Sequence, residues 1–153
     1  MNKARNISVI IMLGLFFLLM PLQSTAQEVT SKGVQWLTSV QQSDGSWNNW
    51  TGTVERDTTV AADSLQILDA TSPSYLLALQ WLATITPLNT DHASRRLFTF
   101  SKTNNDISAD LNYLLAGHHH DGGWGLEVDH ESSPFNTSLA LQALKRSTTP
   151  IKQ

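Results

Sequence analysis

The chain has 153 residues, no cysteine, and a formal net charge of −3 from 10 basic and 13 acidic residues. The absence of cysteine excludes disulfide bonds, cysteine-containing zinc sites and lipid attachment through a cysteine. The acidic balance argues against nucleic acid or an anionic membrane surface as the main partner.

The first 26 residues have the pattern of a secretory signal peptide. Lys3 and Arg5 supply a positive start, residues 7–19 are mostly apolar, and residues 24–26 are small. The apolar run is shorter than the roughly 20 residues that a membrane-spanning helix needs, which disfavours the alternative of an uncleaved anchor. We therefore expect cleavage after residue 26 and a secreted or periplasmic protein with no stable membrane span.

The mature part, residues 27–153, is about 127 residues long, which suits one domain with a single core. The signal carries two basic residues and no acid. The mature charge is therefore 8 minus 13, or −5.

Apolar residues recur at helical spacing in six segments, each bounded by turn or cap residues. These segments predict helices near 29–42, 58–69, 74–86, 90–102, 107–118 and 134–146. Pro73, Pro87 and Pro134 fall at the ends of these segments, where a missing backbone N–H costs least. The sequence therefore predicts an all-α fold.

One stretch of this sequence occurs twice. Residues 32–47, KGVQWLTSVQQSDGSW, are followed 77 positions later by YLLAGHHHDGGW over residues 113–124. The shared positions are Trp36, Gln41, Gly45 and Trp47 in the first copy, and Tyr113, His118, Gly122 and Trp124 in the second. Such a spacing indicates a structural repeat.

The helices that follow the two copies also resemble each other. Residues 62–68 match residues 138–144 at an offset of 76, so the unit is a helix, a turn with Gly and Trp, a loop and a second helix. Residues 74–102 contain Gln80-Trp81-Leu82 without the Gly-x-Trp ending and look like a degenerate copy. A stack of three helical hairpins follows from this pattern.

The motif residues predict a link between successive helices. The amide of Gln41 is expected to donate to the free carbonyls at the end of its helix and to accept from a nearby N–H. Asp44 and Gly45 suit a tight turn, after which the ring of Trp47 can pack on the amide. In the second copy His118 is expected to take over the hydrogen bonds of Gln41.

These residues closely resemble the QW motif of squalene-hopene and oxidosqualene cyclases, and residues 121–125 resemble a common variant of it. The same repeat occurs more loosely in protein prenyltransferase β subunits and other α/α-toroid proteins. The resemblance covers residues 29–146 and implies a partial α/α toroid, half of a six-hairpin ring. A half ring leaves two flanks to be covered by self-association, a partner, capping segments or a second half outside this chain.

The resemblance also implies chemistry for which the sequence lacks residues. It contains no Asp-x-Asp-Asp or Asp-Asp-x-x-Asp cluster, and the family's zinc site needs a cysteine. We interpret the pairs Asp106 with Asp110 and Asp129 with Glu131 as solvated surface, and likewise the doublet Arg95-Arg96. We therefore predict no catalytic residue and no cofactor.

A weaker candidate is a metal site formed by His118, His119, His120 and Asp121, with Asp129 and His130 nearby in the sequence. Consecutive helical residues point about 100° apart, so at most two of the three histidines can face one ion. The simpler interpretation is that His118 replaces Gln41 and that its neighbours are exposed at a helix end.

Three functions follow from these patterns. The first is an exported, non-catalytic helical-repeat domain used for binding or assembly. The second is a fragment of a terpene cyclase or prenyltransferase-like enzyme whose catalytic acids lie outside this chain. The third is a metal-dependent enzyme centred on residues 118–120.

Overall fold

The computed structural model describes residues 25–48 and 52–148. Within these residues the chain forms six helices and no strand, which confirms the predicted all-α class. The chain divides into two compact units, Met1–Ser39 and Val40–Gln153.

The first unit contributes most of one described helix, over residues 25–40. A pair between Glu28 and Lys32, with Oε1 and Nζ 2.6 Å apart, spans one turn of this helix. The helix ends before Gln41, and the predicted extension to residue 42 is wrong. Trp36 is 63% exposed on it. Nearly all of the predicted signal lies outside the described residues, and no described helix combines the length and apolar character needed to cross a membrane.

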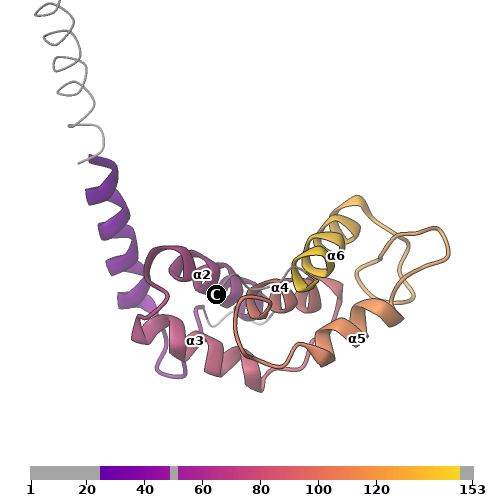
Figure 1. The fold of residues 1–153 in the computed structure, drawn as a ribbon, viewed down its shortest axis with the longest axis horizontal. Helices are drawn as coiled ribbons and strands as arrows, with labels where there is room; N and C mark the ends of the chain where they lie inside the picture. The colour runs from indigo at the N-terminus through magenta and orange to yellow at the C-terminus, as the bar shows by residue number, and fades with distance from the viewer. Residues whose placement is uncertain (1–24, 49–51, 149–153) are drawn as a thin grey trace, which may run out of the picture. The chain divides into compact units, whose positions relative to one another are not determined.

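The second unit contains five labelled helices (Figure 1). They are α2 (Val54–Asp69), α3 (Pro73–Thr84), α4 (Thr90–Phe100), α5 (Ser108–Ala116) and α6 (Pro134–Ser147). Three of them begin at a side-chain cap: Ser72, Asn89 and Ser133 each accept a hydrogen bond from the backbone N–H three residues later. These caps explain why the predicted starts of α3, α4 and α6 agree with the structure to within one residue.

Helix α4 is the centre of this unit and contacts α2, α5 and α6, while α3 packs on α2 (Figure 1). The main core cluster joins α4, α5, the loop after α5 and α6. Its members are Ala93, Leu97, Leu114, Trp124, Ala140 and Ala143, all buried. Alanine on both α4 and α6 permits close approach of these helices, because its side chain is small.

A buried ion pair links α4 to α5. Arg96 Nε lies 2.9 and 3.0 Å from the two carboxylate oxygens of Asp110, and Arg96 Nη1 donates to the Leu82 carbonyl of α3 at 3.3 Å. Asp110 is fully buried and Arg96 is 7% exposed, so the prediction that both are solvated is wrong. Burial raises the pKa of the Asp110 carboxyl, and the neighbouring Arg96 guanidinium opposes this rise. Asp106, in contrast, is exposed as predicted.

Candidate functional site

The first motif forms a tight turn held by its own backbone. Gln42 N–H donates to the Ser46 carbonyl at 2.9 Å, and Gly45 N–H donates to the Gln42 carbonyl at 3.0 Å. Asp44 Oδ1 accepts from Ser46 N–H at 2.9 Å. Gly45 has a φ of 98°, a conformation that glycine adopts without steric cost.

The second motif repeats this turn. His119 N–H donates to the Gly123 carbonyl and Gly122 N–H donates to the His119 carbonyl, both at 3.0 Å. Asp121 Oδ1 accepts from Gly123 N–H at 3.0 Å, and Gly122 has a φ of 88°. Each of these three bonds has its counterpart 77 residues earlier. The two sequence copies therefore fold into the same local structure.

Both turns place a buried tryptophan against the start of the next helix. Trp47 is 5% exposed and donates its backbone N–H to Thr58 Oγ1 of α2 at 3.0 Å. Trp124 is 4% exposed and donates in the same way to Thr137 Oγ1 of α6, also at 3.0 Å. The turn thus fixes the entry of α2 in one copy and of α6 in the other.

These bonds set the structural register between α2 and α6 at 79 residues rather than 76. The predicted offset of 76 would equate Leu65, which is fully buried, with Leu141, which is 54% exposed. An offset of 79 instead equates Leu65 with the half-buried Leu144, and Ala61 with Ala140, both buried. The sequence match at 76 is therefore wrong as a structural register.

Gln41 ties the first turn to α3. Its Nε2 donates to the Gly45 carbonyl and to the Ser74 carbonyl in the first turn of α3, both at 2.9 Å. The acceptors are therefore not the free carbonyls at the end of the preceding helix, as predicted. His118 behaves differently: it is exposed, and its ring centroid lies 4.7 Å from that of Trp124. Its side chain forms no hydrogen bond with the described residues, because the position equivalent to Ser74 is residue 151, outside them.

The two turn glycines give a matched test of close packing. A Cβ on Gly45 would lie 2.4 Å from the Leu77 carbonyl oxygen of α3, whereas a Cβ on Gly122 would meet no atom within 4 Å. We expect Gly122→Ala to cost only about 1–2 kcal/mol for the left-handed backbone. Gly45→Ala should cost clearly more, because the turn must also move away from α3. Urea denaturation of both variants checks this, and equal losses would contradict the role of the α3 contact.

His119 is held in place rather than free at a helix end. Its Nε2 lies 2.9 Å from the Val128 carbonyl oxygen and its Nδ1 lies 3.1 Å from Ser132 Oγ. Ser132 Oγ also donates to Asp121 Oδ1 at 2.9 Å. The hydrogen bonds from Gly123 N–H and Ser132 lower the pKa of the Asp121 carboxyl. Both imidazole nitrogens are engaged, so the candidate set of His118, His119, His120 and Asp121 does not converge on an ion.

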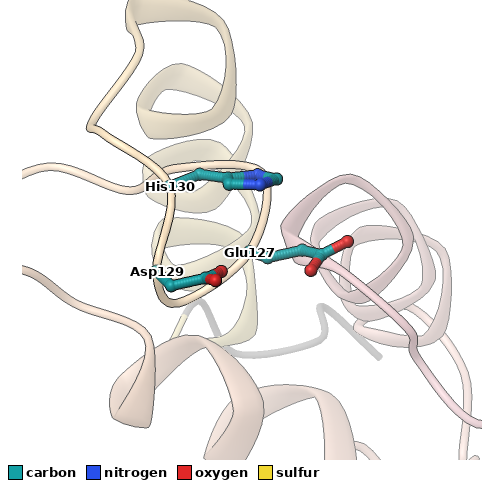
Figure 2. Close-up of side chains that lie close together, drawn as sticks. All are labelled: Glu127, Asp129 and His130. Carbon is teal, nitrogen blue, oxygen red and sulfur yellow. The ribbon is translucent and has the colours of Figure 1, made fainter.

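A different group gathers in the loop between α5 and α6. Figure 2 shows Glu127, Asp129 and His130 on this loop, and one ligand atom from each lies within 4.8 Å of the others. One imidazole and two carboxylates are ligands that borderline divalent metals accept. All three side chains are exposed, and the sequence interpretation included Asp129 and His130 but missed Glu127. Exposed acidic groups often gather without an ion, so this cluster carries no functional assignment.

A cavity of about 130 Å³ lies between α2, α4 and α6. Its lining residues are Thr59, Val60, Asp63, Ser94, Arg95, Phe98, Leu139 and Gln142. Burial raises the pKa of the Asp63 carboxyl, although Asp63 Oδ1 accepts a hydrogen bond from Thr99 Oγ1 at 3.0 Å. The buried Ser94 hydroxyl has no hydrogen-bond partner among the described residues. The sequence analysis missed this cavity because three helices contribute to it.

Comparison with known proteins identifies no relative. No family model, no curated protein and no solved structure matches this chain.

Proposed function

We propose that this chain is an exported helical-repeat domain of the α/α-toroid type that acts by binding or assembly rather than by catalysis. The observation that carries this proposal is the second turn, which reproduces the hydrogen bonds of the first 77 residues away. In repeat proteins each hairpin needs its neighbours to bury its apolar face. A turn that fixes the entry of the next helix serves such stacking.

The buried charged groups also support a scaffold role. Arg96 and Asp110 neutralise each other while joining α3, α4 and α5. Asp63 of α2 is bonded to Thr99 of α4. In both cases a polar side chain holds one helix against another, which is what a stacked architecture requires.

Export is tested by the N-terminus of the mature protein. The chain is expressed with its full N-terminal segment in a bacterial host, and the exported fraction is analysed by N-terminal sequencing. We expect Gln27 as the first residue. Recovery of the chain only from the cytoplasm, with residues 1–26 attached, would contradict the proposal.

The same purified protein distinguishes the scaffold from the enzyme-fragment alternative. Incubation with squalene or with farnesyl diphosphate should leave both substrates unchanged when the extracts are analysed by mass spectrometry. Formation of a cyclised or transferred product would instead favour the enzyme. A buffer incubation without protein controls for spontaneous diphosphate loss.

A further inference from the structure

The turn equivalence allows α2 and α6 to be compared position by position. In α2 one side is covered by its neighbours: Gln66 Nε2 donates to Tyr75 Oη of α3 at 3.1 Å, and Asp63 is bonded to Thr99 of α4. Ala62 lies one turn before Gln66 and is fully buried. This side of α2 is therefore packed against α3 and α4.

The corresponding side of α6 is open. With the register of 79 residues, the equivalents of Thr59, Ala62, Asp63 and Gln66 are Ser138, Leu141, Gln142 and Lys145. These four α6 residues are all exposed, and they are called the open side of α6 below. Leu141 is 54% exposed where its equivalent Ala62 is 0% exposed. The difference arises because no described helix occupies the place next to α6 that α3 and α4 occupy next to α2.

Helix α2 also presents apolar side chains away from α3 and α4. Val60, Ile67 and Leu68 are 49%, 78% and 49% exposed, and they are called the apolar side of α2 below. At the register of 79, Ile67 corresponds to Arg146, whose guanidinium carbon lies 3.7 Å from the centroid of the Phe98 ring of α4. The side of α6 that packs on α4 thus corresponds to a side of α2 whose apolar residues are exposed.

The charges of the two helices are complementary. Helix α2 has four acids and one base, a formal charge of 1 minus 4, or −3. Helix α6 has two bases, Lys145 and Arg146, and no acid, a formal charge of +2. Opposite charges on facing helices favour this pairing over contact between two copies of α6.

We propose that the open side of α6 binds the apolar side of α2 from a second copy of this chain, in a head-to-tail contact that continues the packing of α2, α4 and α6. The proposal rests on the assembly role proposed above and names its partner. Each copy carries both surfaces, so the contact is heterologous and joins two different patches.

A complementation experiment tests this contact. Leu141→Glu places a charge on the open side of α6, and Ile67→Glu places one on the apolar side of α2. Sedimentation velocity should show wild-type assemblies of at least two copies, and each variant alone should be monomeric. An equimolar mixture of the two variants should form a complex, because one keeps an intact α6 side and the other an intact α2 side.

Leu88→Glu is the matched control, since Leu88 is 70% exposed but lies outside both helices. It should assemble like the wild type, and far-UV circular dichroism should be unchanged in all three variants. A wild-type chain that stays monomeric at high micromolar concentration, or a mixture that stays monomeric, would overturn the head-to-tail contact. Such a result would leave the export and substrate tests untouched, so the two proposals fail separately.

Discussion

Trp124→Ala should lower the free energy of unfolding by about 3–5 kcal/mol, the usual loss when a large buried aromatic side chain is removed. Trp124 is 4% exposed in the core formed by α4, α5 and α6, and its Nε1 donates to the Leu114 carbonyl at 2.7 Å. The truncation leaves a cavity between the helices and removes the hydrogen bond to α5. Urea denaturation followed by circular dichroism measures the change.

Trp36→Ala is the matched control for this prediction. Trp36 occupies the first position of the repeated motif but is 63% exposed, so its truncation should change stability by no more than about 0.5 kcal/mol. Equal effects of the two substitutions would show that burial of the second tryptophan of the motif is not what stabilises the fold.

Asp110→Ala should cost about 3–5 kcal/mol, because it leaves the Arg96 guanidinium buried without its carboxylate partner. The loss should appear as a lower midpoint in urea with little change in the slope of the transition. The arginine would keep only its contact with the Leu82 carbonyl and a position 5.8 Å from the centroid of the Phe100 ring.

The double variant Arg96→Met/Asp110→Leu separates unpaired charge from lost packing. Replacing both partners by apolar side chains removes the uncompensated charge, so the double variant should be more stable than Asp110→Ala alone. A double variant as unstable as Asp110→Ala would mean that the loss comes from altered packing rather than from the unpaired arginine.

Much of the second unit follows from local sequence. Ser72, Asn89 and Ser133 cap helices at the predicted places, because a cap depends only on residues three positions apart. The two turns were also predictable, since Asp44-Gly45 and Asp121-Gly122 form each turn from adjacent residues.

The failures concern partners that are distant in the sequence. Arg96 and Asp110 were interpreted as solvated because a charged residue is exposed by default, and nothing local shows that α4 and α5 bring these two together. The partners of His119 likewise come from a loop that folds back on it. The register of 76 failed because similarity of Leu-Gln pairs says nothing about which side of each helix is buried.

The sequence by itself determined an all-α chain, a repeated turn and the approximate ends of its helices, because these depend on interactions within a few residues. Only the tertiary structure decided which charges are buried, which residues of α2 and α6 are equivalent, and which side of α6 is left open. Those properties depend on how helices far apart in the chain pack on each other, and burial of a side chain is a property of that packing.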